Sequence, residues 1–170
     1  LILADGAKLS SVAVDNFTPG IQVTGTGTSL TIYGQAAQTG QLYVEGRTGA
    51  AGIGGGNEQD GSNITINGGK ITISGGVSGA GIGGGYKASG YNIIINGGDV
   101  YVEGGMESAG IGGGGNDGSG HDIIINGGKT TVYGGVDGGS GIGGGNSGIG
   151  RNITITNGVV KAIGGYEDGD

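Results

Sequence analysis

A six-residue motif, AGIGGG (SGIGGG in its fourth copy), recurs at a nearly constant interval and constrains the fold more than any other feature of this chain. Its isoleucines are 29, 29 and 31 residues apart, and they are Ile53, Ile82, Ile111 and Ile142. A second motif, ITINGG or a close variant, keeps the same interval and starts at Ile64, Ile93, Ile123 and Ile153. Self-similarity with a period of roughly 20–50 residues is typical of solenoids and related repeat folds. The repeat is therefore a structural unit whose copies differ mainly in their loops.

Within each repeat, apolar residues occupy every second position. Ile64 and Ile66 flank Thr65, and Ile71 and Ile73 flank Thr72. This alternation is the signature of a β-strand, and glycine at this density disfavours helix. The repeat predicts an all-β fold, a right-handed parallel β-helix with three short strands per coil of about 29–30 residues.

The chain divides into an irregular start and a regular remainder. Residues 1–28 lack AGIGGG and are predicted to form a divergent N-terminal capping coil, because terminal solenoid units are usually atypical. Residues 29–170 are predicted to form the repeat coils of one β-helix domain, with the last coil incomplete. Its strands near residues 153–156 and 160–163 would then have unpaired edges, which invite self-association with another chain.

The third strand of each coil combines isoleucine with glycine. Alternation predicts that Ala80 and Ile82 point inward and that the four motif isoleucines stack. The intervening glycines, Gly81 and Gly83 in this repeat, would then form an outward glycine face. We expect that face to lie against a neighbouring chain or a flat ligand, the alternative being that corner geometry alone demands glycine.

Asparagine residues flank the first strand of each repeat. They precede it at Asn63, Asn92 and Asn152 and follow it at Asn67, Asn96 and Asn126. Asparagine accepts positive φ at turns, and stacked asparagines can bond from coil to coil. These residues are therefore predicted to be corner residues.

The composition of the chain excludes or disfavours several classes of function. Fifty glycines with only one proline and no three-residue register exclude collagen. A net charge of −7 with seven Lys and Arg disfavours nucleic acid, and no apolar run approaches the length of a membrane span. Calcium is possible at acidic loops such as the one holding Glu58 and Asp60, but these acids do not recur in each repeat. We therefore expect no cofactor and no metal.

Several segments resemble a known group of repeats. LILADGAKL, SLTIYGQ, GAAGIGGG and ITINGG, which start at residues 1, 29, 49 and 64, resemble the Gly-rich solenoid repeats of large secreted or surface-attached proteins of gut-type bacteria. The resemblance covers nearly the whole chain. It implies a pectate-lyase-type right-handed β-helix, a carbohydrate-binding or adhesin-like role, and an extracellular or cell-surface location. No catalytic motif of that group can be matched to residues of this chain.

The outward positions of the second strand form the candidate site. One column reads Tyr43, Thr72, Tyr101, Thr131, Lys161, and the next reads Glu45, Ser74, Glu103, Tyr133, Ile163. Aromatic rings stack on apolar sugar faces, while acids and hydroxyls bond to sugar hydroxyls. The alternative is ordinary cross-strand pairing on a solvated sheet. The residues predicted to bind glycan or polysaccharide are Tyr43, Glu45, Thr72, Tyr101, Glu103, Thr131 and Tyr133.

Candidate catalytic groups are sparse. The chain has one histidine, His121, and no cysteine. The densest acids, Asp99, Glu103 and Glu107, have no arginine near them in the sequence, whereas glycoside hydrolysis needs paired carboxylates. We therefore expect a non-catalytic binding or adhesion segment. The alternatives are a structural stalk or self-associating fibre segment and, less favoured, a polysaccharide lyase or glycoside hydrolase.

Overall fold

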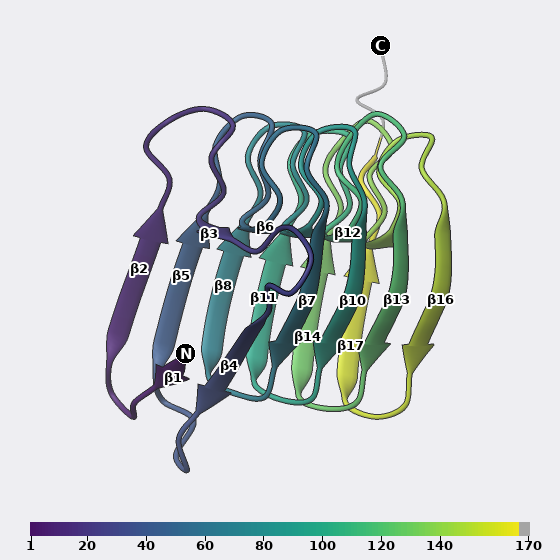
Figure 1. Ribbon diagram of the computed structural model, residues 1–170. Coiled ribbons are helices and arrows are strands. Elements are labelled where there is room, and N and C mark those ends of the chain that lie inside the picture. Colours follow the sequence, from purple (N-terminus) through teal and green to yellow (C-terminus); the bar gives the residue numbers. More distant parts are fainter. Residues whose placement is uncertain (167–170) are drawn as a thin grey trace.

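The chain folds into a solenoid made only of β-strands, as seen in a computed structural model that describes residues 1–166 (Figure 1). Seventeen strands in this part of the chain form three parallel sheets. Sheet 1 contains β1 (Ile2–Leu3), β4 (Leu30–Gly34), β7 (Gly61–Ile66), β10 (Gly90–Ile95), β13 (Gly120–Ile125) and β16 (Gly150–Ile155). Sheet 2 contains β2 (Lys8–Val12), β5 (Gln41–Glu45), β8 (Lys70–Ser74), β11 (Asp99–Glu103), β14 (Lys129–Tyr133) and β17 (Val159–Ile163). Sheet 3 contains β3 (Ile21–Gln22), β6 (Ile53–Gly54), β9 (Ile82–Gly83), β12 (Ile111–Gly112) and β15 (Ile142–Gly143).

Each coil contributes one strand to each sheet. Strands β1 to β15 make five coils of three strands, and β16 and β17 follow them. In Figure 1 the sheet 1 strands run down in front and the sheet 2 strands run up behind, while successive coils advance from left to right. That sense of winding is right-handed, as is normal for parallel crossovers. The predicted β-helix with three strands per coil is confirmed.

The interior is a set of stacked aliphatic columns. Ile53, Ile82 and Ile111 are fully buried, and Ile142 in the last complete coil packs against the same core. In the coil formed by β7, β8 and β9, the inward residues Ile64, Ile66, Ile71, Ile73, Ala80 and Ile82 all have 0% exposure. One coil exposes its apolar face on both sides, so burial requires neighbouring coils and makes the stack cooperative.

The predicted outward glycine face is wrong. Gly81 is buried, and a Cβ built on it would lie 2.7 Å from the carbonyl oxygen of Gly110 and 2.8 Å from that of Glu103. Gly83 has a φ of 135° and would place its Cβ against the carbonyl oxygen of Gly112. The equivalent residues Gly52, Gly110 and Gly141 are buried in the same way. The third strand passes so close to the next coil that only glycine fits, so these residues offer no surface to a partner.

The asparagines do bond from coil to coil. Asn96 Nδ2 donates to Asn67 Oδ1 at 2.8 Å, and Asn126 Nδ2 donates to Asn96 Oδ1 at 2.8 Å. Asn63 and Asn92 have φ of 58° and 52°, as expected for corner residues. They lie inside β7 and β10, however, because these strands begin at Gly61 and Gly90, before the predicted corner. The corner is therefore a kink within a longer strand.

The two ends of the stack differ from its middle. β16 pairs with β13 and β17 with β14, and within residues 1–166 neither strand has a partner on its other edge. At the other end, β1, β2 and β3 form a coil that pairs with β4, β5 and β6. The capping role of residues 1–28 stays a prediction, and the end of the repeat region, residues 167–170, lies outside the described residues.

Candidate ligand-binding face

The outer face of sheet 2 carries the residues predicted to bind a ligand. The parallel register aligns Tyr43, Thr72, Tyr101, Thr131 and Lys161 in one column and Glu45, Ser74, Glu103, Tyr133 and Ile163 in the next. The two predicted columns are therefore confirmed as columns. All seven predicted binding residues lie on this one face, because residues two apart on a strand share a side of the sheet. Their role in binding stays a prediction.

Two tyrosines are held by glutamates on their own strands. Tyr43 Oη donates to Glu45 Oε2 at 2.8 Å, and Tyr101 Oη donates to Glu103 Oε1. The hydrogen bond to Glu45 raises the pKa of Tyr43, with desolvation as the next cause. The bond to Glu103, again followed by desolvation, raises the pKa of Tyr101 to about 12. Both rings are thereby oriented while remaining partly exposed.

Tyr133 joins this face one coil further on. Its ring centroid lies 5.7 Å from that of Tyr101, with the planes tilted by 47°. Lys161 Nζ lies 5.5 Å from the Tyr133 centroid and donates to Tyr133 Oη at 3.2 Å. The C-terminal part of the face is therefore an aromatic cluster covered on one side by a cation.

Shallow hollows separate the tyrosines. One of about 310 Å³ is lined by Ser10, Tyr43 and Thr72, together with Lys8 and Lys70. A second of about 270 Å³ is lined by Thr72, Tyr101 and Thr131, with Asp99 and Lys129 at its edge. Small hydroxyl side chains in alternate coils thus leave depressions between aromatic ridges. Both hollows are open, which suits a ligand that lies along the sheet.

Charged side chains of both signs edge these hollows. Lys129 Nζ lies 3.5 Å from Asp99 Oδ1, and both side chains are more than half exposed. Exposed pairs of this kind contribute at most about 1 kcal/mol. This column therefore supports strand register and provides hydrogen-bonding groups, in keeping with the alternating signs in the sequence.

A second cluster on sheet 1 was not predicted. The Tyr91 and His121 rings stack with centroids 5.0 Å apart and planes within 2° of parallel. His121 Nδ1 lies 2.7 Å from Asp122 Oδ2, and Asn152 Nδ2 donates to Asp122 Oδ1 at 3.0 Å. The contact with His121, followed by the bond from Asn152, lowers the pKa of Asp122. The sequence could have revealed this column, because one position of the repeat, just before the ITINGG motif, is occupied in successive coils by Ser62, Tyr91, His121 and Arg151.

Two kinds of feature are missing from the described residues. In residues 1–166 no group of three or more His, Cys, Asp or Glu could hold a metal ion. The described part of the chain also holds no helix that is long and apolar enough to cross a membrane. The outer face of sheet 2 presents aromatic rings, hydroxyls, carboxylates and ammonium groups in register.

Comparison with known proteins agrees with this architecture. A family model described as Beta helix repeat matches residues 64–86, 93–115 and 153–169. These matches and the three stacked sheets together support a β-helix repeat protein. Neither the curated proteins nor the solved structures include a match to this chain. β-helix repeats occur in enzymes such as pectate lyase and in proteins without catalytic activity, so the fold alone does not decide between them.

Proposed function

We propose that this chain is a non-catalytic binding segment of an extracellular or cell-surface bacterial protein, and that sheet 2 recognises an extended polysaccharide. The observation that carries the proposal is the alternation of oriented tyrosines with hydroxyl-lined hollows. Tyr43 and Tyr101 each have their Oη held by a glutamate, and Thr72 lies between them in the register.

The spacing of the tyrosines suits a repeating ligand. They lie two coils apart, which is about 9.6 Å at one strand spacing of roughly 4.8 Å per coil. Alternate units of an extended polysaccharide recur at a comparable distance. Each ring offers an apolar face beside a polar tip, which favours a ligand that is apolar on one side and hydrated on the other.

The face is shallow, so each contact is expected to be weak. Binding would gain strength through several units engaging at once, since linked contacts raise the effective concentration of each next one. Longer chains of the same glycan should therefore bind more tightly than its disaccharide. Adhesion through many such contacts would suit a surface-attached protein.

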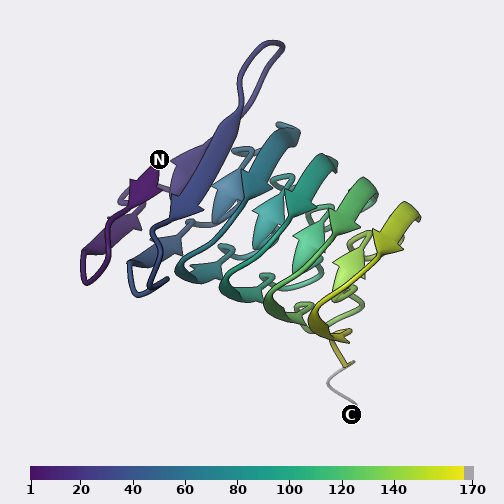
Figure 2. The ribbon, with the colours of Figure 1, turned by 90° about the horizontal axis from the view of Figure 1, so that it is seen from below.

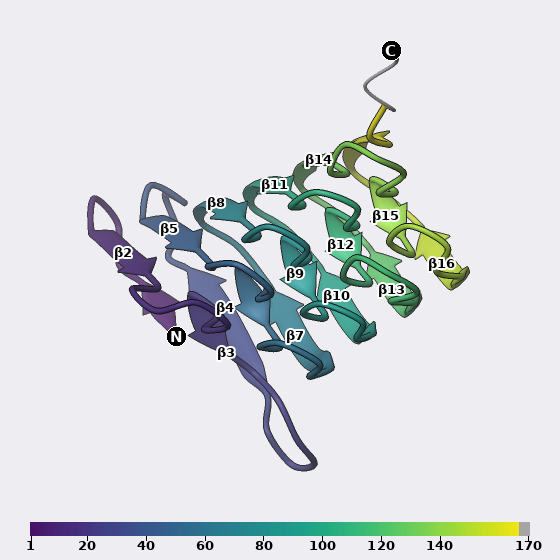
Figure 3. The same ribbon diagram turned by 90° about the horizontal axis from the view of Figure 1, so that it is seen from above.

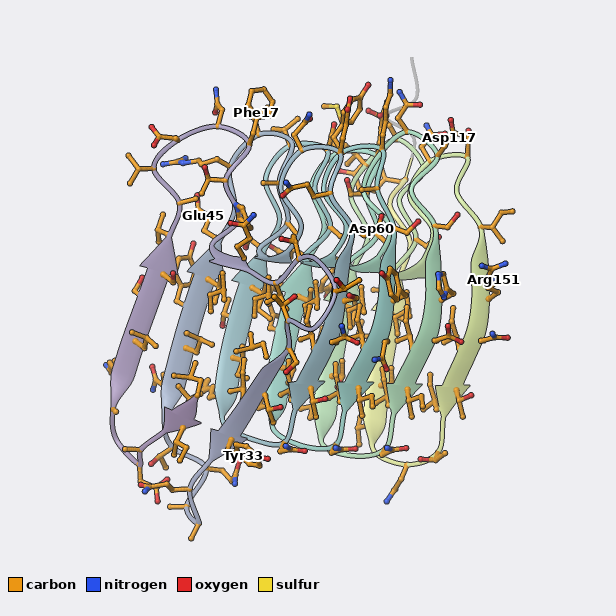
Figure 4. The ribbon with its side chains drawn as sticks, viewed as in Figure 1. Phe17, Tyr33, Glu45, Asp60, Asp117 and Arg151 are labelled. Atoms are coloured by element: carbon orange, nitrogen blue, oxygen red, sulfur yellow. The ribbon has the colours of Figure 1, made fainter. Side chains whose placement is uncertain are left out.

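The experiment is a glycan array followed by titration of any hit. A variant carrying Tyr43→Ala, Tyr101→Ala and Tyr133→Ala should lose binding while keeping the circular dichroism and melting behaviour of the wild type. The matched control is Tyr33→Ala, because Tyr33 is an exposed tyrosine on β4 of sheet 1 (Figure 4). Full binding by the triple variant, or no binding by the wild type to any glycan, would refute the proposal.

A structural stalk is the second candidate, and the edges of β16 and β17 favour it. β16 is exposed along its whole length, and the backbone groups on its outer edge could pair with another chain. Analytical ultracentrifugation over a range of concentrations tests this. Reversible growth into filaments without glycan binding would support the stalk, and a strictly monomeric species would argue against self-association.

Catalysis is tested separately. Incubation with a panel of polysaccharides and an assay for new reducing or unsaturated ends would reveal a hydrolase or a lyase. Depolymerisation that disappears in Glu45→Gln or Glu103→Gln would replace the binding proposal with an enzymatic one.

A further inference from the structure

A hollow of about 600 Å³ opens beside the loop that joins β3 to β4. Figures 2 and 3 show this loop projecting from the solenoid next to sheet 1, unlike the corresponding connections in later coils. Thr24 and Thr26 of the loop form one side of the hollow. Gln59, Asp60, Ser62 and Tyr91 lie among the other lining residues. The volume lies within the range of about 300–1,000 Å³ that is typical of small-molecule sites.

The hollow interrupts a column of flat side chains. Ser62, Tyr91, His121 and Arg151 are aligned in sheet 1, and Figure 4 shows Arg151 on β16 at the edge of that sheet. One face of the Tyr91 ring stacks on His121, with 5.0 Å between centroids. The coil on the opposite side contributes Ser62, which is 4% exposed and accepts a hydrogen bond from Asn63 Nδ2 at 3.3 Å. The column therefore meets the hollow at Tyr91, whose side chain is partly exposed and lines it.

The loop that closes the hollow is internally braced. Thr28 Oγ1 donates to the carbonyl oxygens of Thr24 and Gly25, at 2.5 Å and 2.9 Å. Asn63 Nδ2 donates to the carbonyl oxygen of Thr28 at 3.1 Å and so ties the loop to the next coil. Gly25 and Gly27 adopt φ of 84° and 85°, which lets the chain turn sharply. This loop side of the hollow is therefore formed before any ligand arrives.

Polar groups suited to hydroxyls line the same hollow as Tyr91. Asp60 Oδ1 accepts the backbone N–H of Ser89 at 2.7 Å, and no donor within residues 1–166 pairs with its second carboxylate oxygen. Gln59 Oε1 accepts from Gln22 Nε2 at 3.1 Å, so the Gln59 amide is oriented and its Nε2 remains available as a donor. The lining contains no Lys, Arg or His, so nothing in it neutralises a phosphate or a carboxylate.

We infer that this hollow is a second binding site, for a neutral saccharide ring that stacks on Tyr91. A pyranose offers an apolar face to the tyrosine and an edge of hydroxyls to Asp60, Gln59 and the loop threonines. A bound ring would contact the part of Tyr91 that lines the hollow, while His121 holds the tyrosine ring from its other side at 5.0 Å between centroids. This inference does not depend on polysaccharide binding at sheet 2, which lies on another side of the solenoid (Figure 3).

A neighbouring hollow gives room for more than one sugar unit. It measures about 510 Å³, is lined by Thr31, Thr65 and Ile94 among others, and shares Gly27 and Asn63 with the first. A disaccharide could place one ring on Tyr91 and extend past Gly27 along the outer face of sheet 1. We therefore expect disaccharides to bind more tightly than monosaccharides.

The test is an NMR titration of the intact chain with four probes, the methyl glycosides of glucose, galactose, mannose and N-acetylglucosamine. At least one should shift the backbone amide signals of Gly25, Ser62 and Tyr91 in a saturable way. Tyr91→Ala should weaken that binding by about tenfold or more, since aromatic contacts contribute beyond their buried area. Asp60→Asn keeps the acceptor for Ser89 and should weaken binding without disturbing the fold.

Two controls separate this site from sheet 2. Tyr33→Ala should bind the glycosides as the wild type does, and so should the triple tyrosine variant of sheet 2. Absence of saturable shifts with all four glycosides, or shifts that persist unchanged in both Tyr91→Ala and Asp60→Asn, would overturn the inference. Saturable binding of indole in the absence of any glycoside binding would overturn the assignment to saccharides.

Discussion

Replacing Gly52 with alanine tests why the third strand is made of isoleucine and glycine. Gly52 is buried, and its φ lies outside the left-handed region, so alanine adds only a methyl group and no backbone strain. A Cβ at this position would lie 2.5 Å from Ile73 Cγ2 and 2.8 Å from each of the carbonyl oxygens of Ser74 and Gly81. All three neighbours belong to the adjacent coil.

The size of the effect follows from these distances. Non-bonded carbon atoms rest at about 3.5–4.0 Å, so the new methyl would overlap Ile73 by about 1 Å. Ile73 is fully buried in the aliphatic core, so it cannot move aside without displacing other core side chains. The two carbonyl oxygens accept the N–H groups of Gly46 and Ile53, each at 3.0 Å, so moving them would weaken bonds between coils. Overpacking costs about 1–3 kcal/mol, and we expect about 3 kcal/mol here because backbone atoms must give way.

Thermal unfolding followed by circular dichroism measures this cost. For a chain of this size, about 3 kcal/mol corresponds to a Tm lower by roughly 6–12 °C. Gly164→Ala is the matched control, because Gly164 is exposed and its nearest neighbour, the carbonyl oxygen of Gly139, would lie 3.5 Å from the new Cβ. That variant should stay within about 0.5 kcal/mol of wild type. Equal Tm values for both variants would mean that Gly52 faces open space, and the packing described for sheet 3 would be wrong.

Two further predictions concern polar groups at defined positions. Thr130 Oγ1 is buried without a hydrogen-bond partner among residues 1–166, and Thr130 lies in a column with Val100 and Val160. Thr130→Val should therefore raise the free energy of unfolding by about 1–2 kcal/mol, because it removes an unsatisfied hydroxyl. An unchanged or lower Tm would show that the hydroxyl has a partner. The pKa of Tyr101 is raised to about 12 in the folded protein. Between pH 10 and 12 the folded state therefore keeps the phenolic proton of Tyr101 while the unfolded state loses it. The contribution of Tyr101 to stability falls as the pH rises through that window. Ultraviolet titration of tyrosinate should show late-titrating groups, one of which, Tyr101, has its midpoint moved toward 10 in Glu103→Gln while Tyr43 still titrates late. An unmoved midpoint would assign the shift to another cause.

Much of the fold could be predicted from periodicity alone. The interval between AGIGGG motifs defines the coil, and alternation at Ile64 and Ile66 or at Ile71 and Ile73 distinguishes inward from outward positions. Once coils of equal length stack in parallel, the register follows, and so the column containing Tyr43 and Tyr101 could be predicted. These features depend only on spacing along the chain.

Other features were decided by how the coils approach one another. Sheet 3 has strands of two residues, which are too short for alternation to show which way Gly52 or Gly81 faces. The close approach of carbonyl groups in the adjacent coil shows that neither glycine faces open space. The hollow beside Tyr91 likewise depends on the path of the loop at Thr24–Gly27 and on a small residue at Ser62. Spacing along one chain determines which residues share a column. The distances between backbones in adjacent coils, which only the tertiary structure sets, determine what fits between them.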